Sequence, residues 1–149
     1  MGENKLTVNV AVKSEFRKAM NIAAEIIRGK MESHAKTNIT ANVYDRPESW
    51  YRRTGRLRNG TTTAKDEDSA GNIVIAVGTN VEYAPYVELG TGVYAEGESK
   101  AKEIPWHFMG TDGKWHTTSG VHARPFLRPA VEDHAEEYKA VLEKVLRGG

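Results

Sequence analysis

The chain has 149 residues, of which 39% are hydrophobic and 28% charged, a balance that predicts one folded domain and excludes a fully disordered chain. The 21 Lys and Arg residues against 20 Asp and Glu leave a formal net charge of +1, which excludes a strong overall attraction to DNA or anionic lipid. There is no cysteine, which excludes disulfides and thiolate metal sites, and the longest apolar run, residues 73–77, is too short to cross a membrane.

The N-terminal part is predicted to contain a strand and then a long helix. Apolar and polar residues alternate over residues 6–12, the period-two pattern of a strand with one buried face. Ser14 can cap a helix over residues 15–36, and residues 38–45 are predicted to be extended. The apolar stripe of this helix is Phe16, Met20, Ala23, Ile27 and Met31.

A hairpin is predicted in the middle of the chain. Residues 46–56 combine turn formers with arginines, which is typical of a loop. Residues 57–65 and 72–79 have the composition of strands, and the polar residues 66–71 join them. The second strand carries the sequence Ile-Val-Ile-Ala-Val, which predicts a central place in the sheet.

The next segment is predicted to form a short helix, a mobile loop and a second hairpin. Residues 81–89 fit a helix that Gly90 ends, and residues 91–103 are rich in Gly, Glu and Lys. Two aromatic segments, 104–109 and 114–117, flank a turn at residues 110–113. A four-residue turn would place Phe108 opposite Trp115 and His107 opposite His116.

A second long helix is predicted over residues 129–147. Pro129 suits its first turn, and apolar residues continue at three-to-four spacing (Val131, Ala135, Tyr138, Leu142 and Val145). Together the elements predict an α+β fold, in which a mainly antiparallel β-sheet packs with a long N-terminal helix and a C-terminal helix. We expect residues 1–149 to be a single domain, with a mobile loop and hairpin insertion around 91–122.

Three stretches resemble the neck, or head-to-tail joining, proteins of tailed phages, a family typified by gene product ten of a lambdoid siphophage. They are Tyr-Ala-Pro-Tyr-Val-Glu-Leu-Gly-Thr at residues 83–91, Ala-Arg-Pro-Phe-Leu-Arg-Pro-Ala at 123–130 and the shorter Thr-Gly-Arg-Leu-Arg at 54–58. The segment 92–121 is longer than in the shortest members, and Asn59-Gly60-Thr61 departs from the family pattern.

The resemblance implies a structural virion protein of a phage or prophage that forms a ring, with the six-fold symmetry of the tail, at the head–tail connection. A tail terminator or tail-tube end protein is the nearest alternative, since such proteins share size and ring symmetry. The implied location is the neck or tail of the virion, with the host cytoplasm as the place of assembly. The implied interaction residues are those of the two longer motifs: Tyr83, Tyr86, Glu88, Leu89, Gly90, Thr91, Arg124, Pro125, Phe126, Leu127, Arg128 and Pro129.

Each longer motif has two physical interpretations. Pro125 and Pro129 stiffen the chain, so Phe126 and Leu127 are held either in the protein's own core or against another subunit. Gly90 either caps a helix before an ordinary loop or lets another backbone approach closely.

Charge is unevenly distributed between two segments. Residues 46–58 hold five Arg and one Glu, whereas residues 82–103 hold five Glu and two Lys. Adjacent copies in a ring would pair these segments, or both are simply solvated loops. The candidate arginines for inter-subunit or DNA contact are Arg52, Arg53, Arg56 and Arg58.

Two other classes of function are weaker alternatives. The arginines with Trp50 and Tyr51 have the composition of a small nucleic-acid-binding module, but the patch is short and the isoelectric point is only about 8.0. His107, His116, His122 and Asp112 lie close in sequence, as in a metal-dependent hydrolase, but their spacing matches no known motif. We therefore expect no catalytic residue, no metal and no cofactor. The expected partners are further copies of the chain and other connector and tail proteins, with at most non-specific DNA contact in the channel and no membrane.

Overall fold

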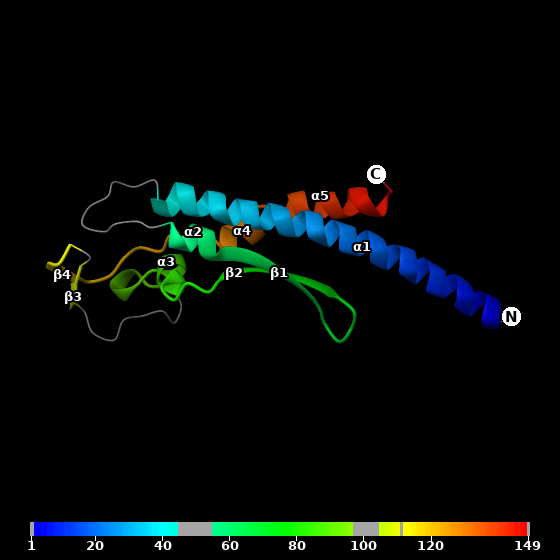
Figure 1. Ribbon diagram of the computed structural model, residues 1–149, viewed down its shortest axis with the longest axis horizontal. Helices are drawn as coiled ribbons and strands as arrows, with labels where there is room; N and C mark the ends of the chain where they lie inside the picture. Colours follow the sequence, from blue (N-terminus) through cyan, green and yellow to red (C-terminus); the bar gives the residue numbers. More distant parts are fainter. Residues whose placement is uncertain (1, 45–54, 97–104, 111, 149) are drawn as a thin grey trace.

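A helix of 37 residues, α1 (Gly2–Asn38), is the longest element of the computed structural model, which describes residues 2–44, 55–96, 105–110 and 112–148. Figure 1 shows the C-terminal helix and a β-hairpin lying along α1, with a second, smaller hairpin at the end of the molecule far from the N-terminus. The predicted α+β class is confirmed, because a long N-terminal helix and a C-terminal helix pack with antiparallel strand pairs. Within these described residues, no helix is both long and apolar enough to span a membrane.

The helix α1 is longer than the sequence pattern predicted. The strand expected over residues 6–12 is wrong, because α1 includes these residues. No proline interrupts the chain before Asn38, and β-branched residues cost a helix only a few tenths of a kcal/mol each, so extending an existing helix is easy. The buried side of α1 is made largely of small residues, which let other elements approach closely: Ala23, Ala24, Met31 and Ala35.

The end of α1 widens into a π-helical turn, η1 (Ile39–Tyr44), where extended chain was predicted. Ile39 is fully buried. The side-chain amides of Asn38 and Asn42 donate to the carbonyl oxygens of Phe126 (3.2 Å) and Pro125 (3.4 Å). These contacts, together with the buried Ile39, favour continued helical winding over an extended strand.

The predicted middle hairpin is confirmed, although its first strand starts later than expected. A short helix, α2 (Arg56–Gly60), precedes β1 (Thr61–Glu67), and the buried Thr61 hydroxyl donates to the Leu57 carbonyl at the junction. β1 pairs antiparallel with β2 (Ile73–Thr79), in a register that runs from Thr61 opposite Thr79 to Glu67 opposite Ile73. The Asp68 carboxylate accepts backbone N–H groups of Ala70 and Asn72 and so builds the turn.

β2 does not lie in the centre of a sheet. Within the described residues it pairs only with β1, so both strands of this hairpin are edge strands. α1 packs against both strands, and the burial alternates along β2, with Ile73 and Ile75 half-buried and Val74 and Ala76 exposed. The face of this hairpin that is turned away from α1 is therefore not covered by any part of the described chain.

The second hairpin forms, but in a register one residue away from the predicted one. β3 (Trp106–Met109) pairs with β4 (Trp115–Thr118), and Phe108 lies opposite His116 while His107 lies opposite Thr117. The predicted pairing of Phe108 with Trp115 and of His107 with His116 is wrong. The backbone N–H of Gly110 donates to the Lys114 carbonyl at 2.8 Å, so Lys114 belongs to the turn and not to the strand.

The predicted C-terminal helix is two helices, α4 (Arg128–Glu132) and α5 (Ala135–Leu146). The break falls at His134, whose φ of −116° and ψ of 13° are not helical. The buried Tyr138 hydroxyl donates to the Ala130 carbonyl, an acceptor that an uninterrupted helix would offer to the amide four residues on. Burial, with the nearby Glu137 charge, raises the pKa of Tyr138 to about 12, so this hydroxyl stays protonated and remains a donor.

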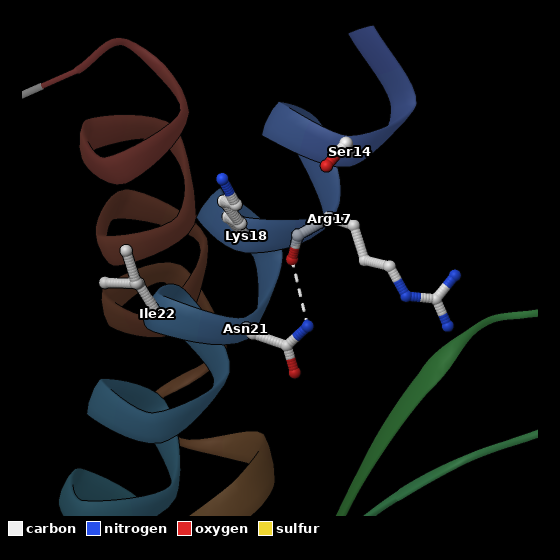
Figure 2. A pocket seen from close by; sticks show the side chains of 5 residues that line it. All are labelled: Ser14, Arg17, Lys18, Asn21 and Ile22. Atoms are coloured by element: carbon white, nitrogen blue, oxygen red, sulfur yellow. Dashed lines mark hydrogen bonds between the residues drawn. The ribbon is translucent and has the colours of Figure 1, made fainter. Parts of the chain in front are cut away.

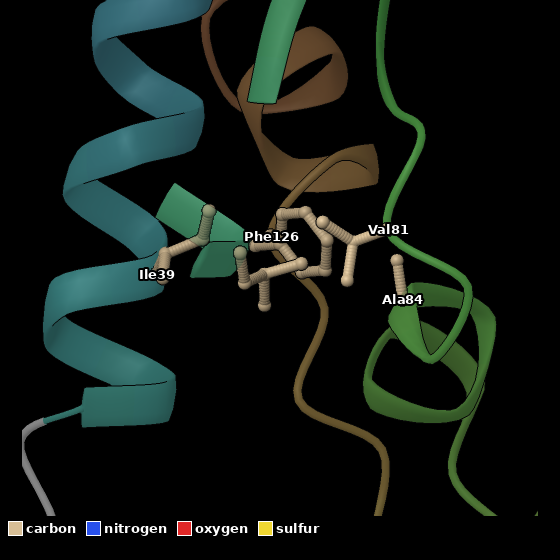
Figure 3. Close-up of a cluster of buried hydrophobic side chains, with 5 residues drawn as sticks. Ile39, Val81, Ala84 and Phe126 are labelled. Carbon is tan, nitrogen blue, oxygen red and sulfur yellow. The ribbon is translucent and has the colours of Figure 1, made fainter. Parts of the chain in front are cut away.

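The core lies where α1 ends and the two motif segments meet. Figure 3 shows the Phe126 ring between Ile39 on one side and Val81 and Ala84 on the other. Leu57 completes this buried cluster, and Phe126, at 0% exposure, is its largest side chain. The partly buried residues packed around it are Val43, Tyr44, Tyr83, Val87 and Leu127.

Candidate interaction site

Glu88 joins the two longer sequence motifs. It lies near the end of α3 (Ala84–Leu89), the predicted short helix that Gly90 ends. Its Oε2 atom accepts the backbone N–H groups of Phe126 (2.7 Å) and Leu127 (2.9 Å), and its Oε1 atom accepts that of Arg128 (2.9 Å). Three successive amides of the second motif are therefore held by one carboxylate of the first.

The local sequence explains why a carboxylate is needed there. The amides at the start of a helix have no acceptor within the helix, and a negative charge is stabilised next to them. No side chain from α4 itself caps this end, and Pro129 fixes the direction of its first turn. Glu88 therefore acts as a cap supplied from 40 residues away in the sequence.

A short backbone ladder extends this junction. The N–H of Arg124 donates to the Val87 carbonyl (2.7 Å), and the N–H of Thr91 donates to the Val121 carbonyl (2.9 Å). Next along the chain, the N–H of Val93, in the 3-10 helix η2 (Gly92–Tyr94), donates to the Ser119 carbonyl (3.0 Å). The start of the predicted mobile loop is therefore an ordered turn, and the predicted loop residues 97–103 lie outside the described residues.

Glycines allow the two segments of this ladder to cross at close range. At Gly92, φ is +60° and an added Cβ would lie 2.0 Å from the Ser119 carbonyl oxygen. At Gly90, φ is +75° and a Cβ would lie 2.7 Å from the Val121 carbonyl oxygen. The backbone that approaches these glycines thus belongs to the same chain.

We expect Gly92→Ala to lower the free energy of unfolding by about 2–3 kcal/mol, because a side chain adds left-handed strain and overlaps the Ser119 carbonyl. Urea denaturation followed by circular dichroism measures the change. Gly29→Ala is the matched control, since Gly29 lies within α1 with nothing near its Cβ position, and it should stabilise by about 0.5–1 kcal/mol. Equal urea midpoints for Gly92→Ala and the parent would contradict the close crossing.

The predicted motif residues divide into buried and exposed ones. Phe126 is fully buried in the chain's own core, which agrees with the first of its two interpretations, and Leu127 is partly buried beside it. Gly90 is buried and Pro125 is partly buried in the junction. Tyr86 is 58% exposed, and Arg128 is exposed and pairs with Glu96 at 3.2 Å. Tyr86 and Arg128 are therefore exposed, whereas Phe126 and Gly90 are enclosed by the chain itself.

The basic segment is only partly described. Arg52 and Arg53 lie outside the described residues, and Arg58 is exposed. The Arg56 guanidinium donates to both Glu82 carboxylate oxygens, at 2.9 and 2.7 Å, and this hydrogen bonding lowers the pKa of Glu82. The pairing between arginines and glutamates of these two segments, which was predicted between copies, thus also forms within one chain.

The histidines proposed as a hydrolase site are not brought together. His116 lies 3.0 Å from Asp112, His107 lies 2.7 Å from the Thr117 hydroxyl, and the His122 ring contacts that of Tyr94 at a tilt of 31°. Among the residues that the structure describes, the one group of three side chains able to share a metal ion lies elsewhere and contains none of these four residues.

A shallow depression on α1 does not resemble a catalytic pocket. Figure 2 shows that one helix supplies all of its lining, and the Asn21 side-chain amide donates to the Arg17 carbonyl there. Substrate sites are usually concave and enclosed by several elements with convergent polar groups. The lining residues are Ser14, Arg17, Lys18, Asn21 and Ile22.

Two features of the junction between the motifs were not predicted from the sequence. Glu88 was assigned to the motif, but not its capping of Phe126, Leu127 and Arg128. The amides of Asn38 and Asn42, which hold the Phe126 and Pro125 carbonyls, were not identified. A signal was present, because asparagines four residues apart share one side of a helix.

A family model described as "HK97-gp10_like: Bacteriophage HK97-gp10, putative tail-component" matches residues 3–90, more than half of the 149 residues. The match includes α1, the first hairpin and α3 with Glu88, and it ends before the second motif. No curated protein and no solved structure matches the sequence.

Proposed function

Since the chain belongs to the HK97-gp10-like family of phage tail components, we propose that it is a structural, non-enzymatic protein of the head–tail connection that forms a ring. The family match carries the proposal, and it supports a structural phage role and a location in the virion. The ring, its six-fold symmetry and the position in the neck go beyond the match. We extend the proposal to a host-cytoplasmic stage before assembly, in a phage or prophage life cycle.

The first hairpin has the properties of an assembly surface. Both β1 and β2 are edge strands within the described residues, and unpaired strand edges readily accept a strand from another chain. Val74 is 47% exposed on the face turned away from α1. A neighbouring copy that adds a strand or covers this face would continue the sheet around a ring.

The exposed aromatic residue on the second hairpin supports a second contact with another protein. Trp115 is 71% exposed on β4, and exposed aromatic residues are enriched in protein interfaces. The ladder of Thr91 and Val93 with Val121 and Ser119 closes the base of the intervening segment, which agrees with an insertion around 91–122 into one domain of 149 residues. We propose that this insertion contacts a neighbouring connector or tail protein.

The arginine segment contributes to register between copies. Arg56 is engaged with Glu82 in its own chain, so the inter-subunit role falls to Arg52, Arg53 and Arg58, with Arg56 as an exchangeable partner. The same arginines would give at most non-specific contact with DNA in the channel, because the net charge of the chain is only +1.

Deletion of the gene in the parent phage, followed by electron microscopy of lysates, tests the role. We expect full heads and complete tails that do not join, with joining restored by the parent protein supplied in trans. Tails of uncontrolled length would instead indicate the alternative, a tail terminator or tail-tube end protein. Normal virions would refute a place in the connection.

The hairpin surface is tested by Val74→Lys in the same complementation experiment. The new lysine lies opposite Asp66 in the register, so folding should persist, but its charge should prevent another copy from covering the sheet. We expect at least a tenfold loss of infectious particles. Ala140→Lys, at an exposed position of α5, is the control and should complement fully. Full complementation by both variants would exclude this hairpin as an assembly surface.

A further inference from the structure

Two histidines and one glutamate from distant parts of the chain converge between α1 and α5. His34 comes from the last turns of α1, His134 immediately precedes α5, and Glu137 lies in its first turn. Glu137 Oε2 lies 2.9 Å from His34 Nε2 and 3.3 Å from His134 Nδ1. One atom from each of the three residues lies within 4.8 Å of the others.

These distances resemble those between the ligands of a small tetrahedral ion. Zinc–nitrogen and zinc–oxygen bonds of about 2.0–2.1 Å place neighbouring ligand atoms roughly 3.3 Å apart. The two imidazole rings are stacked, with centroids 3.4 Å apart and planes at 5°. Because a nitrogen lone pair lies in the plane of its ring, both rings can bind one ion only after rotating out of this parallel stack, and both side chains are partly exposed.

The carboxylate is oriented by a further partner on α1. Lys30, one turn before His34 on α1, donates to Glu137 Oε1 at 2.9 Å and leaves Oε2 facing the histidines. The side chains of all three ligand residues are partly exposed, at 26% for His34, 30% for His134 and 37% for Glu137, so an ion has access from solvent.

We propose that His34, His134 and Glu137 bind one zinc ion, which joins the end of α1 to the start of α5. Two imidazoles and a carboxylate suit zinc and similar transition metals, whereas magnesium and calcium prefer oxygen ligands throughout. In the free protein, the two histidines direct ring nitrogens at a shared carboxylate oxygen, and the ion takes the place of those contacts. The fourth coordination position is open to water or to a side chain from a neighbouring protein.

The helix break lies within this cluster. His134 is the non-helical residue that precedes α5, and its ring stacks on that of His34. The inference does not depend on the proposed virion role, because it concerns the stability of one chain.

Isothermal titration of the full chain with zinc chloride, after treatment with a chelator and its removal, tests the proposal. We expect one zinc ion per chain, a higher unfolding temperature with zinc than without, and no binding of magnesium under the same conditions. His134→Ala and Glu137→Gln should each weaken zinc binding at least tenfold, since even residues behind the ligands contribute about that much.

His107→Ala is the matched control, because it removes an exposed histidine outside the cluster and should leave zinc binding unchanged. Circular dichroism in the presence of chelator checks that each variant is folded, and Glu137→Gln provides a second, isosteric variant if His134→Ala is not. The proposal is overturned if the parent protein binds no zinc. It is also overturned if His107→Ala loses zinc binding equally, or if both cluster variants still bind zinc.

Discussion

Replacing Phe126 by Ala is expected to lower the free energy of unfolding by about 3–5 kcal/mol, because it removes the largest fully buried side chain of the core. The ring fills the space between Ile39 at the end of α1 and Val81 before α3, so its loss leaves a cavity that three separate segments line. Urea denaturation monitored by circular dichroism measures the change.

Phe16→Ala is the matched control for this truncation. Phe16 lies on α1 and is 54% exposed, so the same substitution should change stability by less than about 0.5 kcal/mol. If Phe126→Ala is as stable as Phe16→Ala, the second motif does not supply the core, and the alternative interpretation, a contact with another subunit, regains support.

Local signals were sufficient to predict the first hairpin and the short helix before Gly90. The polar stretch around Asp68 and Gly71 marks a turn, and the apolar run Ile-Val-Ile-Ala-Val that follows it marks β2. These features depend on neighbours in sequence. Gly90, with its positive φ, likewise ends α3 where expected.

Long-range contacts decide the elements that were predicted wrongly. Residues 6–12 alternate as a strand would, but within the described chain no strand edge pairs with them and α1 continues through them. The π-helical turn at Ile39 is held by the Phe126 segment, and α5, which follows the break at His134, is held against α1 through Glu137 and His34. The spacing of apolar residues within one segment does not indicate which distant segment will pack against it.

The candidate site was predictable in composition but not in arrangement. Both motifs were identified from their residues, and the family match confirms the phage assignment. That Glu88 reaches the amides before Pro129 depends on the fold, since 40 residues separate Glu88 from Arg128. The cluster of His34, His134 and Glu137 was missed for the same reason.

The Glu88 contacts lead to the second large expected effect. Glu88→Ala should lower the free energy of unfolding by about 3–4 kcal/mol, because three backbone donors lose a charged acceptor. The loss is smaller than the sum of three isolated bonds, since the exposed Arg128 N–H can donate to water instead. Urea denaturation gives the magnitude.

Amide hydrogen exchange identifies the cause of this loss. In Glu88→Ala, the amides of Phe126, Leu127 and Arg128 should exchange faster than in the parent under conditions where both are folded. Glu88→Gln keeps one acceptor oxygen and should lose roughly half as much stability, whereas Glu132→Ala, an exposed control on α4, should change neither measurement. Destabilisation without faster exchange at those three amides would mean that Glu88 acts through α3 alone. Faster exchange confined to them would establish that one carboxylate holds the two motifs together.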